Sequence, residues 1–302
     1  MARPVEHRLE IVLCSFSGTG NTDLTAEAAA KEFSRAGAEV RHYRIEDILK
    51  NREPEARDRI EEADLLGILH PVYAFGPPGL VRRFIKTLSG GRGRPVFFMR
   101  TAADFVSINS AASGPDIRLL RKRGYRVIYE RLFAMGCNWL IPYDDAFIKR
   151  LYETMRERMP EACADILAGR ERRARFGPFT SLWAGFVNWA EVRIGSPVFG
   201  RFLRAKDACT SCGFCVRNCP ACNITMTDKG PRFGWCCLSC MRCIYTCPRD
   251  AIVPGIFRKV KIAGGYRVRD IVNNASVVSK GIDPGTRGYL AHFREYLEDP
   301  KM

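Results

Sequence analysis

Between residues 9 and 150, short apolar runs alternate with amphipathic stretches of helical period. Apolar runs, which read as strands, cover residues 9–15, 39–45, 64–72, 95–101 and 125–134. Helical patterns lie between them at 22–37, 54–63, 79–88 and 115–124, and another spans about 145–173. Strands separated by helices imply right-handed crossovers. The pattern therefore predicts an α/β domain, residues 1–172, built on a five-stranded parallel sheet with helices on both faces.

The following segment, residues 173–205, is rich in aromatic residues and is predicted to link two domains. Glycine and proline interrupt it at 177, 178, 185, 195, 197 and 200, so we expect several pieces rather than one continuous helix. Two interpretations of its aromatic positions, 176–202, stay open. They either pack between domains or form a patch that faces a partner or a membrane.

The rest of the chain divides at residue 254. Residues 206–254 carry a dense cysteine cluster and form the predicted second domain, a small α+β unit. The tail, residues 255–302, is basic at first, and its stretch 285–299 is predicted to form a short helix. The sequence assigns the tail no chemistry.

Composition and charge narrow the class of protein. The 302 residues include 13 cysteines, and the start of the chain lacks an apolar segment of signal-peptide type, so we expect a cytoplasmic protein with reduced, metal-bound thiolates. The formal charge of +15 is typical of proteins with anionic partners. A solvated basic surface is one interpretation, and docking to acidic redox partner proteins or to a membrane surface is the other. Nucleic acid is not an expected partner.

The loop after the first predicted strand, residues 15–22 (SFSGTGNT), points to a phosphate ligand. Such a loop aims backbone N–H groups and a helix N-terminus at an anion. It lacks the lysine of a triphosphate-binding loop, and Asp23 stands where a dinucleotide fingerprint needs its third glycine. The remaining donors are neutral hydroxyl and amide groups, which suit a terminal monophosphate.

The segment Ser17-Gly18-Thr19-Gly20-Asn21-Thr22 resembles the flavodoxin phosphate loop, and the order of elements over about residues 8–170 is similar to flavodoxin. The resemblance implies FMN, with its ring at the carboxyl ends of strands three and four. Beyond the loop, candidate ring contacts are Tyr73, Phe75, Thr101, Ala102, Ala103, Asp104 and Phe105. Asn138 and Trp139 approach the ring in the same interpretation. For His70, packing at a strand end and proton delivery both stay open, and Cys14 is predicted to be a core thiol.

Two cysteine segments repeat at a displacement of 28 residues: CTSCGFCVRNCP from Cys209 and CLSCMRCIYTCP from Cys237. Each offers three closely spaced thiols and a fourth set apart before proline, Pro220 or Pro248. Zinc needs only two pairs, so the spacing favours iron–sulfur clusters.

The repeat resembles a bacterial-type ferredoxin with two [4Fe-4S] clusters, and the chain to about residue 254 is similar to flavodoxin–ferredoxin fusion proteins. The resemblance implies that the two halves exchange their fourth ligands. One cluster is then held by Cys209, Cys212, Cys215 and Cys247, and the other by Cys237, Cys240, Cys243 and Cys219. Cys222 and Cys236 fall outside the motif and are expected to line the cluster pockets without binding iron.

Two functions follow from these cofactors. The first is an electron-transfer protein that relays electrons between the clusters and FMN, as a carrier or a subunit of a larger oxidoreductase. The second is an FMN-dependent reductase of a small acceptor, a quinone or an enoyl compound, fed by the clusters. The sequence has no acid–base constellation that separates them, so enzymatic activity is left undecided.

Overall fold

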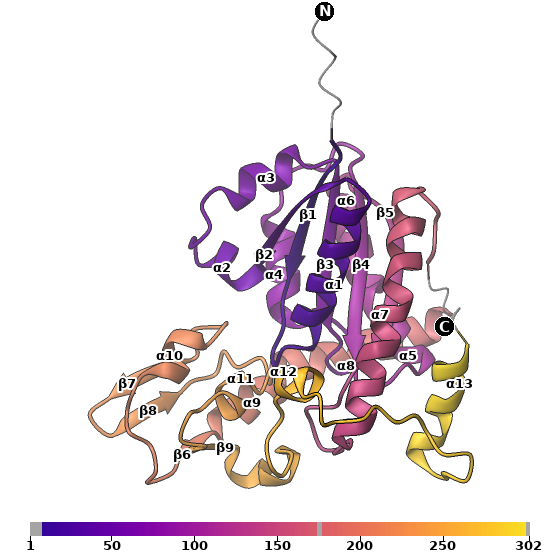
Figure 1. The fold of residues 1–302 in the computed structure, drawn as a ribbon. Helices are drawn as coiled ribbons and strands as arrows, with labels where there is room; N and C mark the ends of the chain where they lie inside the picture. Colours follow the sequence, from indigo (N-terminus) through magenta and orange to yellow (C-terminus); the bar gives the residue numbers. More distant parts are fainter. Residues whose placement is uncertain (1–7, 174–176, 300–302) are drawn as a thin grey trace, which may run out of the picture.

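The computed structural model describes residues 8–173 and 177–299. Its centre is a five-stranded parallel sheet with the strand order β2-β1-β3-β4-β5 (Figure 1). The strands are β1 (Glu10–Ser15), β2 (Glu39–Arg44), β3 (Leu65–Pro71), β4 (Pro95–Ala102) and β5 (Arg126–Ala134). This is the doubly wound order, whose switch point beside β1 is the usual ligand site. The predicted sheet is confirmed.

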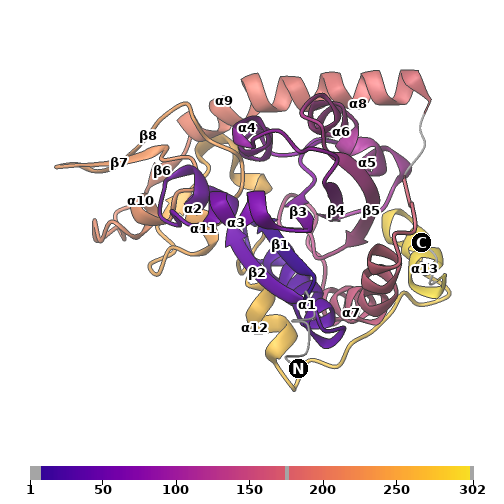
Figure 2. The ribbon, with the colours of Figure 1, turned by 90° about the horizontal axis from the view of Figure 1, so that it is seen from above.

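Helices cover both faces of the sheet, as predicted (Figure 2). One face packs on α1 (Asn21–Arg35) and α7 (Asp145–Leu167). The other packs on α2 (Ile45–Leu49), α3 (Ala56–Glu62), α4 (Gly79–Thr87) and α6 (Gly114–Lys122), while α5 (Ser107–Ser110) follows β4. Cys14 is fully buried in the second of these cores, as expected.

The aromatic segment differs from its prediction. It is helical without a break from Pro178 to Arg201, as α8 (Pro178–Ala190), a π-helical turn (Glu191–Gly195) and α9 (Ser196–Arg201). Proline is tolerated in the first turn of a helix, where its missing N–H has no role. Pro178 occupies that position in α8, whereas Pro197 is the second residue of α9, directly after the wider π turn that joins the two helices. The expectation of separate pieces was therefore wrong.

The cysteine-rich segment, residues 206–254, forms a small unit beside the carboxyl end of the sheet (Figure 1). It contains α10 (Phe214–Asn218), the hairpin β7 (Ile224–Thr227) and β8 (Gly230–Phe233), and α11 (Arg242–Tyr245). Its ends meet where β6 (Arg204–Ala205) pairs with β9 (Ile252–Val253). The sequence repeat is visible in the backbone, because left-handed residues recur in matched pairs. These are Ser211 with Ser239, Gly213 with Met241, and Cys222 with Asp250.

The tail returns along the first domain. It contains η3 (Gly255–Val260), α12 (Val268–Asn273), η4 (Tyr289–His292) and α13 (Phe293–Glu298), and α13 confirms the predicted terminal helix. The Tyr296 hydroxyl accepts a hydrogen bond of 2.9 Å from the Ala134 N–H group at the end of β5. Over residues 8–173 and 177–299, every helix is too short or too polar to cross a bilayer.

Candidate functional site

The loop between β1 and α1 is shaped by its own hydroxyl groups. The Ser17 hydroxyl accepts a hydrogen bond of 3.0 Å from the Gly20 N–H group, and Gly20 has a left-handed φ of 107°. Asn138 donates to the Thr19 hydroxyl at 2.7 Å, and the Thr22 hydroxyl lies 2.7 Å from that of Thr101. These hydroxyls, predicted to hold phosphate, already have partners within the chain.

Several backbone N–H donors of the loop are unpaired among the described residues. Within the described parts of the chain, the N–H groups of Gly18, Thr19, Asn21 and Thr22 have no hydrogen-bond partner. Free N–H groups at the start of a helix attract anions, because the helix dipole adds to their partial positive charge. The loop therefore matches a monophosphate through its backbone more than through its side chains.

Two distant segments meet at the buried residue Gly18. A Cβ atom added there would lie 2.4 Å from the Cys240 carbonyl oxygen and 2.6 Å from the Tyr73 hydroxyl. No larger residue fits this position without moving backbone. The Tyr73 hydroxyl is itself buried with no hydrogen-bond partner in the described chain, and burial raises its pKa well above the usual value. The close approach brings the cysteine-rich segment directly against the predicted phosphate loop.

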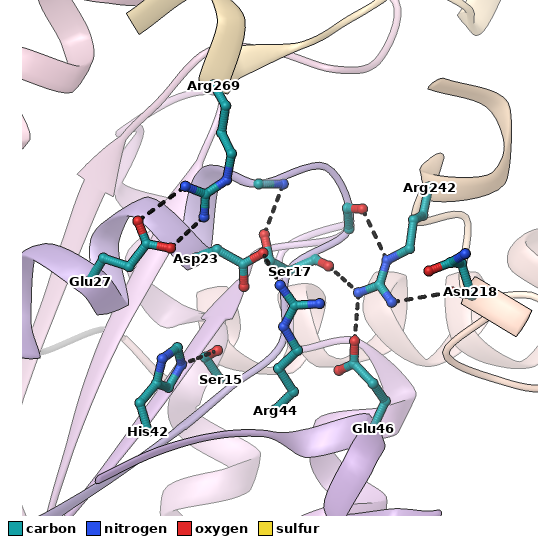
Figure 3. Close-up of polar contacts among 12 residues, drawn as sticks. Ser15, Ser17, Asp23, Glu27, His42, Arg44, Glu46, Asn218, Arg242 and Arg269 are labelled. Atoms are coloured by element: carbon teal, nitrogen blue, oxygen red, sulfur yellow. Dashed lines mark hydrogen bonds and ion pairs between the residues drawn. The ribbon is translucent and has the colours of Figure 1, made fainter. Parts of the chain in front are cut away.

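Arg242 is the main polar link across this contact (Figure 3). Its guanidinium forms an ion pair of 2.6 Å with Glu46 at the start of α2. It also donates to the carbonyl oxygens of Ser17 and Gly18 and, on the other side, to that of Asn218. Both members of the ion pair are largely buried. Breaking one side of such a pair is costly, since it leaves a buried charge without compensation.

The tail covers the loop from another side. The Tyr266 hydroxyl lies 2.6 Å from the Asn21 side-chain oxygen and 3.0 Å from the Gly136 carbonyl oxygen, to which the Asn21 amide also donates. A Cβ atom at Gly20 would approach Val268 to 3.0 Å. The side-chain amide of Asn21 is thus held by these contacts and is not free to bind a ligand.

An outer ring of polar contacts holds α1 in place (Figure 3). Arg269 of α12 forms a two-pronged ion pair with Glu27, and Arg44 pairs with Asp23 at 3.3 Å. Burial raises the pKa of Asp23, although Arg44 opposes the shift. These contacts fix the N-terminal end of α1, at which the loop's free N–H groups lie.

The predicted ring contact Phe75 lies in a tight turn after β3. Tyr73 and Gly76 exchange backbone hydrogen bonds, which forces left-handed φ values of 45° on Ala74 and 62° on Phe75. Such values are strained for residues with side chains and are common at ligand-binding loops. Asn188 of α8 holds the turn by donating to the Tyr73 carbonyl oxygen at 3.0 Å.

The predicted contacts after β4 divide between two places. Thr101 touches the loop through Thr22, whereas Asp104 and Phe105 face the tail. His292 contacts an Asp104 carboxylate oxygen at 2.9 Å, and Phe105 stacks on Tyr296 with ring centroids 5.0 Å apart. The Ala102 carbonyl oxygen accepts from the Met135 N–H, and that of Ala103 accepts from the Tyr143 hydroxyl.

Two further candidates have packing roles. His70 is completely buried against Phe98, and burial lowers its pKa to about 4. The structure thus favours packing over proton delivery for this residue. Trp139 packs on Phe199 of α9, with ring centroids 4.9 Å apart, while its neighbour Asn138 reaches the loop.

The cysteine-rich segment contains two cavities, each lined by four cysteines. One lies beside the phosphate loop and is lined by Cys219, Cys237, Cys240 and Cys243. The other is farther from the loop and is lined by Cys209, Cys212, Cys215 and Cys247. The two sets are the same as those that the ferredoxin resemblance implies.

The arrangement of these thiols does not correspond to a site for a single metal ion. In the described ranges, no three or more His, Cys, Asp or Glu side chains converge closely enough for one metal ion. A four-iron cluster differs, because each thiolate binds a different iron atom. Backbone N–H groups point at the sulfurs of Cys219 and Cys247 from residues 223 and 251, at 3.2 and 3.3 Å. Cys222 and Cys236 are exposed and line neither cavity, which corrects the expectation that they do.

Several residues of this site were missed from the sequence. Arg242 had a signal, because it stands where the first cysteine segment has Phe214 and so breaks the repeat. Nothing in the sequence pattern marked Tyr266 or Asn188 as part of the site. Each acts on a loop more than a hundred residues away in the chain, and local patterns do not report such contacts.

The strand order and the loop at its switch point define a flavodoxin-like α/β domain. Residues 8–115, less than half of the chain, match the family model described as NADPH-dependent FMN reductase. This part of the protein is thus similar to FMN reductases. The comparison with curated proteins gives no match.

Solved structures with similarity to the chain include three flavodoxin-like examples. A flavodoxin from the domain Archaea is 13% identical, with a TM-score of 0.37, over 52% of this chain and 99% of its own. The Megasphaera elsdenii flavodoxin is 19% identical, with a TM-score of 0.36, over 51% and 98%. A putative quinone reductase from Klebsiella pneumoniae is 11% identical, with a TM-score of 0.40, over 57% and 93%.

Proposed function

We propose that this protein is an electron-transfer flavo-iron–sulfur protein that relays electrons between two [4Fe-4S] clusters and FMN. The contact at Gly18 is the observation that carries the proposal, since it brings the phosphate loop and a four-cysteine cavity together. When bound, FMN exchanges one or two electrons and each cluster one, so together they convert between the two kinds of transfer.

The chain's own groups support this assignment. The free N–H groups of residues 18, 19, 21 and 22 are available to bind the FMN phosphate. Cys219, Cys237, Cys240 and Cys243 would hold the cluster nearer to FMN, and Cys209, Cys212, Cys215 and Cys247 the farther one. The contacts of Arg242, Tyr73 and Tyr266 fix the geometry of the junction.

The second candidate is an FMN-dependent reductase of a small acceptor. It is favoured by the family match over residues 8–115. Burial of Ser17, Gly18 and Thr22 bears equally on both candidates, because both place the FMN phosphate at this loop. Rapid reduction of a quinone by the isolated, pre-reduced protein would favour this candidate over the carrier.

Cofactor content is the direct test. Protein purified without oxygen should contain about eight iron atoms, with matching sulfide, and about one FMN per chain. A Cys240→Ser variant should lose one cluster, whereas Cys236→Ser, with its exposed thiol, should keep both. Zinc in place of iron, or protein that does not take up flavin, would contradict the proposal.

The junction itself has a separate test. A Gly18→Ala variant should bind FMN at least about tenfold more weakly, because its Cβ would collide with the Cys240 carbonyl oxygen and the Tyr73 hydroxyl and shift the phosphate loop, while the farther cluster, held by Cys209, Cys212, Cys215 and Cys247, is retained. Gly90→Ala is the matched control, since a Cβ there meets no atom within 4 Å. Equal FMN affinity in the two variants would argue against a flavin site at this loop.

A further inference from the structure

Helix α8 carries an apolar face that nothing in the described chain covers. Its large side chains recur every three or four residues, and they continue into the π turn. We call these residues the α8 stripe: Phe179, Leu182, Trp183, Phe186, Trp189 and Ile194, each at least half exposed. The rings of Trp183, Phe186 and Trp189 stack in sequence, with centroid distances of 6.2 and 6.1 Å.

The opposite face of α8 fixes this orientation. Ala184 and Asn188 are buried against the first domain. Besides holding the Tyr73 carbonyl oxygen, Asn188 donates to that of Pro77 at 3.3 Å, and a Cβ at Gly76 would collide with its amide. Because the helix is anchored on its polar side, the α8 stripe cannot turn inward without breaking these contacts.

The elements around α8 are basic and have almost no exposed acid. Helix α8 runs along the outer side of α4 and α6 (Figure 2). The exposed cations of these helices and of the segment after α8 are Arg83, Lys86, Arg118, Arg121, Lys122, Arg193 and Arg201. None of them has an ion pair within the described residues. The acids of these elements are engaged, Asp116 with Arg82 at 3.1 Å and Glu191 with the Ser196 hydroxyl at 2.6 Å.

We propose that this face docks on a lipid bilayer rich in anionic headgroups, with α8 lying in the plane of the interface. Tryptophan and phenylalanine flanked by arginine and lysine are typical of interfacial helices. A second copy of the chain fits less well, because its equivalent face would bring like charges together. The inference concerns a surface remote from the Gly18 junction and does not depend on the redox function.

Vesicle binding by the full-length protein tests the proposal. We expect it to sediment with vesicles of phosphatidylcholine and phosphatidylglycerol, but not with phosphatidylcholine alone, and to be released as the salt concentration rises. A Trp183→Ser/Phe186→Ser variant should partition at least about tenfold more weakly. Trp235→Ser, which removes a tryptophan of similar exposure from the cysteine-rich segment, should bind like the unmodified protein.

A second pair of variants tests whether vesicle binding depends on the charges of this face or only on the net positive charge of the protein. Arg118→Glu/Arg121→Glu should weaken binding strongly, while Arg232→Glu/Arg249→Glu, with the same change in net charge, should not. Unchanged circular dichroism would show that each variant is folded. Absence of vesicle binding, equal loss in both charge pairs, or dimerisation through the α8 stripe detected by light scattering would each overturn the proposal. The first result would point to an acidic protein partner.

Discussion

At the scale of single residues, the site depends on side chains that act far from their own segment. Arg242 follows a cluster-ligand candidate by two residues, yet its guanidinium reaches the first domain at Glu46, Ser17 and Gly18. Its charge also lies over the ring of Phe16, at 5.8 Å. One arginine therefore ties the start of the phosphate loop to the cysteine-rich segment.

Removing one partner of this ion pair should be more harmful than removing both. We expect Arg242→Gln to lower the free energy of unfolding by about 3 kcal/mol, because Glu46 then remains buried and unpaired. The double variant Glu46→Gln/Arg242→Gln should recover part of that loss. Urea unfolding of the unmodified protein, the two single variants and the double variant gives the coupling energy between Glu46 and Arg242. Strictly additive losses would show that the pair is not coupled.

His70 gives a pH dependence with a defined sign. Its folded pKa of about 4 lies below the usual 6.5, because burial disfavours the charged ring. Between these values the unfolded chain binds the proton and the folded chain does not, so stability falls as the pH falls. The contribution lost between pH 7 and pH 5 should be about 2 kcal/mol. Unfolding of His70→Gln over this range should show a correspondingly flatter slope, and an unchanged slope would contradict the assignment.

At the scale of elements, the sequence predicted most of the first domain. Each strand was placed within two residues at either end. For β1, β3, β4 and β5 the reason is that buried parallel strands are continuous apolar runs that polar turns interrupt, whereas the edge strand β2 is largely exposed. The prediction for the aromatic segment, residues 173–205, was wrong because it relied on local signals that did not break the helix. Its glycines and prolines are local signals of a break, but Pro178 stands in the first turn of α8, and Pro197 directly follows the π turn that joins α8 to α9.

Helix α8 is coupled to the turn after β3 through one close approach. A Cβ at Gly76 would lie 2.1 Å from the Asn188 side chain, so Gly76→Ala should destabilise the protein by about 2 kcal/mol. Asn188→Ala makes room but leaves the Tyr73 and Pro77 carbonyl oxygens without their donor. The double variant should therefore lose at least about 1 kcal/mol less than the sum of the two single losses. Thermal unfolding measures all three, and additivity would contradict this packing.

At the scale of the whole molecule, three parts of the chain meet at one loop. The sequence predicted the phosphate loop and the four-cysteine repeats as separate sites, since each is a local motif. It did not predict that Cys240 lies against Gly18 or that Tyr266 of the tail holds Asn21. Such contacts depend on how complete elements pack, and one sequence carries no local signal of that.

We expect this junction to make the two predicted domains unfold as one cooperative unit. Besides the Arg242 contacts, Lys50 donates to the Cys219 carbonyl oxygen at 2.6 Å and the Tyr245 hydroxyl to that of Asn138 at 3.0 Å. Because interfaces of this kind add stability only while both sides are folded, calorimetry should show a single unfolding transition.

In a Lys50→Ala/Arg242→Gln variant, the cysteine-rich segment should unfold separately and at lower temperature. Lys31→Ala/Arg232→Gln removes two exposed cations that lie outside the junction, and it should retain the single transition. Two transitions in the unmodified protein would mean that the junction does not couple the domains, whatever cofactors they hold.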